Sequence, residues 1–150
     1  MIEVKDEQSM VALGERIGRL LCGGEIIELV GDVGAGKTTF VRGLARGMGV
    51  DETVQSPSFT ISRQYDAGGG LCLAHYDFYR LDDPGIMADE LAEVLGQEKS
   101  VTVIEWSDTV RSVLPEDKLT MTISTVSEAV RSIHLGHGGD KSKKLEEQIG

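Results

Sequence analysis

Residues 31–38 read Gly31-Asp32-Val33-Gly34-Ala35-Gly36-Lys37-Thr38, a complete match to the pattern G-x-x-x-x-G-K-[ST]. Gly31 and Gly36 carry no Cβ, so successive backbone N–H groups can point inward at a phosphate chain. Lys37 brings a positive charge to the β- and γ-phosphates, and the Thr38 hydroxyl can ligate Mg²⁺. The stretch therefore predicts a phosphate-binding loop and the binding of a nucleotide.

The segments on either side place this loop between a strand and a helix. Residues 25–30 are mostly apolar and β-branched, which favours a buried strand. Residues 39–45 continue as the first turns of a helix, which should end near Gly47 and Gly49. The N-terminus of such a helix carries a partial positive charge that favours a bound phosphate.

The rest of the chain alternates between helix and strand patterns. Helices are expected over 6–21, where apolar residues recur at helical spacing, and from about 82 to 95. Strand patterns occupy 58–65 and 71–78, which should form a hairpin, and then 100–104, 118–125 and 129–135. This alternation predicts a three-layer α/β/α domain with a mixed, largely parallel sheet.

The expected domain spans residues 1–136. Residues 137–150 are expected to form a flexible C-terminal tail, because they begin with a polar, glycine-rich run. Lys144-Leu145-Glu146-Glu147 is the part of this tail that could form a frayed helix.

Composition excludes several functional classes. The chain has 15 Lys and Arg against 25 Asp and Glu, a net charge of −10. Affinity for nucleic acid comes largely from basic side chains that neutralise phosphates, so the chain is not expected to bind DNA or to grip RNA by itself.

No apolar run approaches the roughly 20 residues that span a bilayer, and the start of the chain has no signal-peptide pattern, so a cytoplasmic protein is expected. Cys22 and Cys72 are expected to be buried small side chains and not a disulfide.

Two carboxylates are candidates for metal binding and catalysis. Ligands of open α/β sheets bind at the C-terminal ends of the strands, and hydrolysis needs an oriented water at the γ-phosphate. Glu105 directly follows the apolar strand 101–104 in a layout like a Walker B motif, and Asp77 ends the second arm of the hairpin. The alternative for both is an ordinary surface carboxylate. His75 is given no role, because a histidine on a strand is more often structural.

Two further features stay open. The segment Gln55-Ser56-Pro57-Ser58-Phe59-Thr60 lies where GTPases and related enzymes keep a switch that senses the γ-phosphate, which makes Thr60 a switch candidate. Hydroxyl residues beside proline also form ordinary turns. Trp106, the only tryptophan, either packs in the core or walls the nucleotide site.

Taken together, these motifs resemble the TsaE (YjeE) family of bacterial ATPases, which take part in the threonylcarbamoyladenosine modification of tRNA. The matching stretches are residues 31–40, Ser56-Pro57-Ser58-Phe59-Thr60, His75-Tyr76-Asp77-Phe78-Tyr79-Arg80-Leu81, Ile104-Glu105-Trp106 and Leu114-Pro115. Their order and spacing agree from about residue 6 to residue 135. Ser58 stands where the family usually has threonine, which keeps a hydroxyl.

The resemblance implies a weak ATPase that uses ATP and Mg²⁺ together with two partner proteins, TsaB and TsaD. TsaD modifies adenosine 37 of ANN-decoding tRNAs, and ATP would reset the TsaB–TsaD pair between turnovers, so tRNA is met only indirectly. The resemblance also implies residue roles. Thr38 and Glu105 would hold Mg²⁺, and Asp77 would position the attacking water or the coordination shell of the metal. Thr60 falls in the segment that is proposed to respond to the nucleotide state. The phosphates would be held by the Lys37 side chain and by the backbone amides of Gly34, Ala35, Gly36, Lys37, Thr38 and Thr39.

Other functions use the same loop. A small-molecule kinase is one, but such kinases usually need an Arg-rich lid, and no closely spaced Arg pair lies outside the predicted core elements. A GTPase is disfavoured because the sequence contains no N-K-x-D. A regulatory module that binds ATP with negligible hydrolysis fits the same residues. The C-terminal strands around Arg131 are a candidate for one wall of the adenine pocket.

Overall fold

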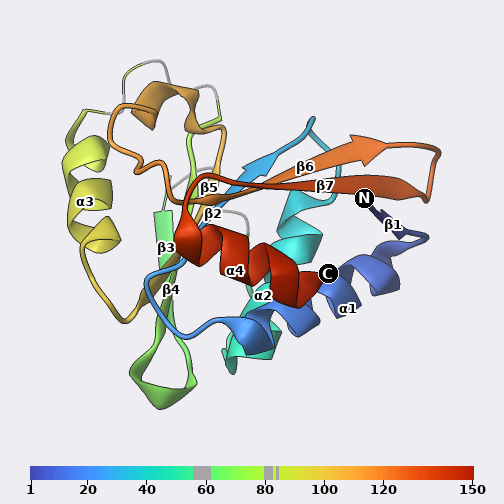
Figure 1. Cartoon of the computed structure of the whole chain (residues 1–150), viewed down its shortest axis with the longest axis horizontal. Coiled ribbons are helices and arrows are strands. Elements are labelled where there is room, and N and C mark those ends of the chain that lie inside the picture. Colours follow the sequence, from blue (N-terminus) through green and yellow to red (C-terminus); the bar gives the residue numbers. More distant parts are fainter. Residues whose placement is uncertain (56–61, 80–82, 84) are drawn as a thin grey trace.

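The computed structural model of the chain describes residues 1–55, 62–79, 83 and 85–150. It is built around one seven-stranded sheet with the strand order β1-β7-β6-β2-β5-β4-β3 (Figure 1). In chain order the elements are β1 (Ile2–Val4), α1 (Glu7–Leu20), β2 (Ile26–Val30), α2 (Lys37–Met48), β3 (Ser62–Asp66), the short 3-10 helix η1 (Gly68–Gly70), β4 (Cys72–Asp77), α3 (Ile86–Leu95), β5 (Ser100–Glu105), the 3-10 helix η2 (Ser107–Val110), β6 (Leu119–Thr125), β7 (Arg131–His137) and α4 (Asp140–Ile149).

The sheet is parallel in its centre and antiparallel at both edges. Strands β6, β2, β5 and β4 run parallel to one another, whereas β7 and β1 at one edge and β3 at the other are antiparallel to their neighbours. Every residue of β5 is buried, as expected for a parallel strand covered on both faces. The predicted mixed sheet is confirmed.

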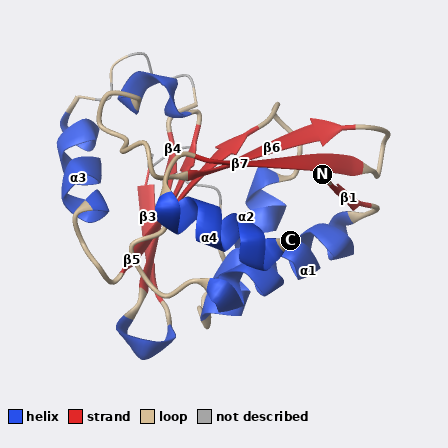
Figure 2. Ribbon diagram, viewed as in Figure 1, coloured by secondary structure: helices blue, strands red, loops and turns tan. Residues whose placement is uncertain are grey.

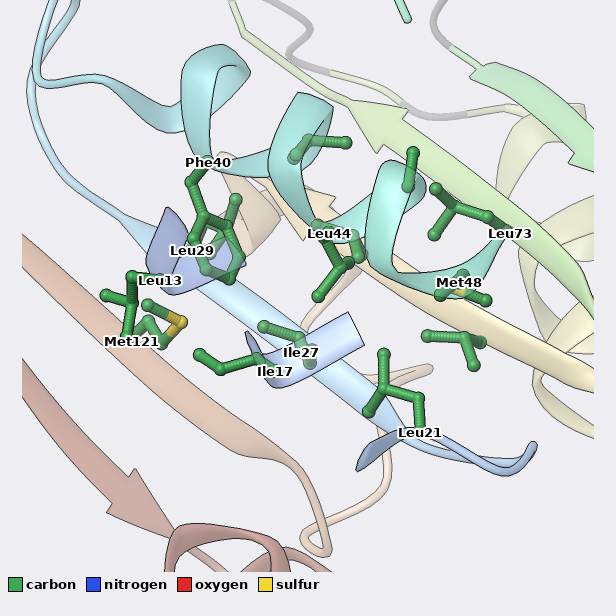
Figure 3. Close-up of a cluster of buried hydrophobic side chains, with 14 of the residues drawn as sticks. Leu13, Ile17, Leu21, Ile27, Leu29, Phe40, Leu44, Met48, Leu73 and Met121 are labelled. Carbon is green, nitrogen blue, oxygen red and sulfur yellow. The ribbon is translucent and has the colours of Figure 1, made fainter. Parts of the chain in front are cut away.

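Helices cover both faces of this sheet and form three layers (Figure 2). Helices α1, α2 and α4 lie on one face, and α3 lies on the other. The larger core fills the space between α1, α2 and the sheet, with Ile17, Phe40 and Leu44 fully buried against Ile27 (Figure 3). A smaller core packs Leu91 of α3 against the opposite face.

Four glycines let α1 and α2 pack backbone against backbone. Gly14 and Gly18 lie one turn apart on α1, and Gly43 and Gly47 lie one turn apart on α2. A Cβ at Gly14 would lie 2.4 Å from the carbonyl oxygen of Phe40, and one at Gly43 would lie 2.2 Å from that of Val11. The two helices therefore pack with their backbones in direct contact at these glycines.

Local signals explain most of the observed helix ends. Asp6 caps α1, because its Oδ1 accepts the backbone N–H of Ser9 at 2.8 Å. Helix α2 continues through Gly47 and ends at Gly49, which has a φ of 93° that favours glycine. The hairpin and α3 are also present. The expected starts of the hairpin's first arm (58–61) and of α3 (82 and 84) lie outside the described residues.

The C-terminal segment differs from the expected flexible tail at 137–150. Strand β7 continues to His137, and α4 then packs on the sheet with Leu145 and Ile149 buried in the larger core. Lys141 ties the helix to the loop between α1 and β2, since its Nζ donates to the carbonyl oxygen of Gly23 at 2.7 Å. The domain therefore includes this segment. Two apolar residues one turn apart are too weak a signal to predict a packed helix from sequence.

The start of α4 is capped by a residue from another part of the chain. Asp117, just before β6, accepts hydrogen bonds from the Ser142 N–H at 2.9 Å, the Ser142 hydroxyl at 2.6 Å and the Lys141 N–H at 3.2 Å. These hydrogen bonds, led by the Ser142 hydroxyl, lower the pKa of Asp117.

We expect Asp117→Ala to lower the free energy of unfolding by about 1 kcal/mol, the usual contribution of a capping side chain. Because the folded-state pKa is depressed, this contribution is present above the unfolded-state pKa and is lost as the pH falls through the folded-state value. Urea denaturation at neutral and acidic pH measures both effects. Asp108→Ala is the matched control, since Asp108 pairs only on the surface with Arg111. An equal loss in both variants would argue against the capping role.

The cysteines were predicted to be buried, and this is wrong. Cys22 is exposed and Cys72 is half-buried, and both are free thiols. No helix within the described ranges has the length and apolar character needed to cross a membrane.

Candidate functional site

The phosphate-binding loop joins the end of β2 to the start of α2. Gly34 and Gly36 have φ angles of 82° and 106°, conformations that a side chain would strain. Gly31 is needed for a different reason, because a Cβ there would lie 2.9 Å from the carbonyl oxygen of Ile123. The backbone turn required for a phosphate cradle therefore depends on all three glycines.

Strand pairing brings the two candidate carboxylates together beside this loop. Asp77 and Glu105 end the parallel strands β4 and β5 and are direct register partners. Both carboxylates are almost fully buried, with 7% and 3% of their surface exposed. Asp77 Oδ1 accepts the backbone N–H of Tyr79 at 2.9 Å, which orients that carboxyl group. These are not ordinary surface carboxylates.

The loop and the carboxylates line one cavity of about 350 Å³. Its lining residues are Val33, Gly34, Gly36, Lys37, Thr38, Thr39, Asp77, Tyr79, Glu105 and Trp106. Of the residues singled out from sequence, Ala35 faces a neighbouring cavity instead, and Thr60 lies outside the described residues. The cavity thus combines loop amides, an ammonium group, a hydroxyl and two buried carboxylates.

Lys37 is held inside the cavity by its own loop and by an aromatic ring. Its Nζ donates to the Gly31 carbonyl oxygen at 2.5 Å and lies 4.1 Å from the centroid of the Trp106 ring. Burial lowers the pKa of Lys37, while the nearby carboxylates of Glu105 and Asp77 act in the opposite direction.

Trp106 forms a wall of this cavity. Its ring also lies 4.9 Å from that of Tyr79, centroid to centroid. Among the described residues it is the one non-glycine residue with a positive φ, 55°. Such backbone strain is common at functional sites. Trp106 also packs against the smaller core, so this residue both packs in the core and borders the cavity.

His75, for which the sequence indicated no role, contacts Glu105 from the interior of the sheet. It is fully buried on β4, and its Nε2 lies 2.6 Å from Oε2 of Glu105. The available signal was the spacing, since His75 stands two residues before Asp77 and therefore on the same face of the strand.

A second cavity, of about 330 Å³, lies on the other side of the loop. The two cavities share Gly34, Gly36 and Thr39, and the remaining lining comes from Ala35 of the loop, the start of α1, the β6–β7 turn and the first residue of β7. Arg131 of β7 borders it and donates from Nε to the Ala35 carbonyl oxygen at 3.1 Å. Segments this distant in sequence could not be assigned to one pocket before the sheet order was known.

Comparison with known proteins agrees with this geometry. The family described as "Threonylcarbamoyl adenosine biosynthesis protein TsaE" matches residues 4–133. The chain belongs to the TsaE family. The resemblance drawn from the motifs is confirmed.

Individual TsaE relatives match most of the chain. The tRNA threonylcarbamoyladenosine biosynthesis protein TsaE of Treponema pallidum is 38% identical over 86% of this chain and 94% of its own length. The protein of the same name from Streptomyces coelicolor is 40% identical over 76% of this chain and 78% of its own length. The crystal structure of YdiB from Bacillus subtilis has a TM-score of 0.78, with 29% identity, and covers 99% of this chain and 91% of that one. The TsaE family match ends within β7. The structural match with YdiB covers nearly the whole chain and therefore includes α4.

Proposed function

We propose that this TsaE-family chain binds and hydrolyses ATP in support of the threonylcarbamoyladenosine modification of tRNA. The observation that carries the proposal is the cavity where Lys37, Thr38 and the buried pair Asp77 and Glu105 meet at the phosphate-binding loop. The relatives' names supply the biological setting.

The phosphates would lie in the first cavity, held by Lys37 and by the backbone amides of Gly34 to Thr39. The donors around it suit Mg²⁺, which prefers oxygen ligands, because the Thr38 hydroxyl and the Glu105 carboxylate border the same space. When bound, Mg²⁺ would neutralise charge on the β- and γ-phosphates. Asp77 would position the attacking water or the shell of the metal.

The nucleoside would lie in the second cavity, because this space adjoins the first through Gly34, Gly36 and Thr39. A ligand that crosses the loop at these residues could occupy both spaces at once. Arg131 would support this wall of the site through its hydrogen bond to the loop.

The partners proposed for the chain are the proteins TsaB and TsaD. Its net charge of −10 suits contact with a basic protein surface and does not suit a direct grip on tRNA. ATP hydrolysis would reset the TsaB–TsaD pair between turnovers, so tRNA would be reached only through the complex.

The proposal is tested by measuring ATP hydrolysis by the chain alone and with purified TsaB and TsaD. We expect slow turnover alone, stimulation by the pair, and a loss of roughly 100-fold or more in Lys37→Ala, which removes a charge aimed at the phosphates. Lys99→Ala is the matched control, because Lys99 is exposed and lies just before β5, away from the loop.

Two outcomes would contradict the proposal. Phosphate transfer to an added metabolite, without stimulation by the pair, would identify a small-molecule kinase. Tight ATP binding with no turnover in any mixture would identify a regulatory module.

A further inference from the structure

The contact between His75 and Glu105 is unusual for a purely structural histidine. His75 is 0% exposed, and its Nε2 is hydrogen-bonded to the carboxylate of Glu105, which borders the proposed nucleotide cavity. The second ring nitrogen, Nδ1, is buried without a hydrogen-bond partner in the part of the chain that the structure describes. An unsatisfied buried polar atom is destabilising, so an apolar side chain would fill this space with less loss of stability.

The hydrogen bonding indicates one tautomer of the ring. We take the Glu105 carboxylate as the acceptor in this contact, with Nε2 of His75 carrying the hydrogen that is shared with Oε2. Nδ1 is then a bare acceptor, so the His75 ring itself leaves no N–H group buried without a partner. This arrangement uses one oxygen of Glu105 and leaves Oε1 to serve the cavity.

The register of the sheet determines the position of His75 relative to Glu105. His75 pairs with Val103 and Asp77 with Glu105 across β4 and β5, so His75 lies one step below the carboxylate pair on the same face. Both strands belong to the parallel centre of the sheet. The ring therefore approaches Glu105 from the protein interior, opposite to the side from which a ligand would approach.

We propose that His75 is a positioning residue, which holds Glu105 in the orientation that presents Oε1 to the Mg²⁺ that Glu105 would help to hold. The inference rests on the proposed function, because it gives Glu105 a ligand to face. Hydrogen-bond partners behind a ligating group commonly change metal affinity or activity by about 10- to 100-fold when they are removed.

Two amide substitutions separate positioning from simple space filling. The Gln amide nitrogen can reach the place of Nε2, whereas the Asn amide nitrogen falls near the place of Nδ1, away from Glu105. We expect His75→Asn to lower kcat by about 10- to 100-fold and to weaken Mn²⁺ binding by about 10-fold. The KM for ATP should stay within about twofold, because the loop still holds the phosphates. His75→Gln should recover most of both losses.

The experiment therefore has two readouts. One is steady-state hydrolysis at varied Mg²⁺ concentration. The other is Mn²⁺ binding in the presence of a non-hydrolysable ATP analogue, followed by electron paramagnetic resonance, which needs no turnover. A double-mutant cycle adds Glu105→Gln, and His75→Asn should cause little further loss in that background.

The outcomes distinguish this inference from the proposed function. If the unmodified chain turns over ATP while the Asn and Gln variants behave alike, or while the losses at His75 and Glu105 multiply, the positioning role is wrong. If the unmodified chain neither binds nor hydrolyses ATP, the proposed function fails and this inference fails with it. Thermal unfolding of each variant identifies losses that come from unfolding alone.

Discussion

Asp77→Asn is expected to reduce ATP turnover by roughly 100-fold or more while leaving ATP affinity nearly unchanged. The substitution keeps the size of the side chain and an oxygen that can accept the Tyr79 N–H, which lies 2.9 Å from Oδ1. It removes the negative charge beside Glu105 that we assign to the attacking water or to the metal's shell. An interaction made mainly in the transition state is lost, whereas the loop contacts to the phosphates remain.

Affinity and turnover can be measured on the same protein. Trp106 is the only tryptophan and lines the cavity, so its fluorescence should report nucleotide binding directly. Asp66→Asn is a suitable control, because Asp66 is exposed at the other end of the hairpin. Unchanged turnover in Asp77→Asn would remove Asp77 from the mechanism. A parallel loss of affinity would assign it to binding the metal and nucleotide instead.

Gly43→Ala is expected to lower the free energy of unfolding by about 3 kcal/mol, near the upper end for overpacking a core. The added Cβ would lie 2.2 Å from the carbonyl oxygen of Val11, and a backbone atom of a packed helix cannot move away by a change of rotamer. The better helix propensity of alanine, about 1 kcal/mol, offsets only part of this cost. Helix α1 would have to shift away from α2 to make room.

Urea denaturation compares this variant with Gly136→Ala. A Cβ at Gly136 would meet nothing within 4 Å, so that substitution should be close to neutral. Similar stability in the two variants would show that the α1–α2 contact yields more easily than its geometry indicates. Gly43→Ala should also weaken nucleotide binding, because α2 begins at the phosphate-binding loop.

Elements with a strong local pattern were predictable from sequence. The loop at 31–38 has fixed residues with separate physical tasks, α1 shows clear apolar periodicity, and β5 is a short apolar, β-branched run. Elements that depend on contacts between distant segments were not predictable from their local pattern. Helix α4 is held by Leu145, Ile149 and a cap from Asp117, and none of these contacts is local.

The candidate site was only partly predictable. That Asp77 and Glu105 each end a strand follows from the chain itself, but their pairing depends on β4 and β5 being neighbours in the sheet. The contact between His75 and Glu105 depends on the same neighbour relation. A pattern along one strand indicates which face a side chain occupies, and it carries no information about which strand lies beside it.

The sequence by itself determined the phosphate-binding loop, the α/β class and the TsaE resemblance, because these depend on short local patterns and on their order along the chain. Only the tertiary structure decided the second cavity, the glycine contact between α1 and α2 and the buried partner of Glu105. Each of these joins segments that are far apart in sequence, so each exists only once the sheet order and the helix packing have brought them together.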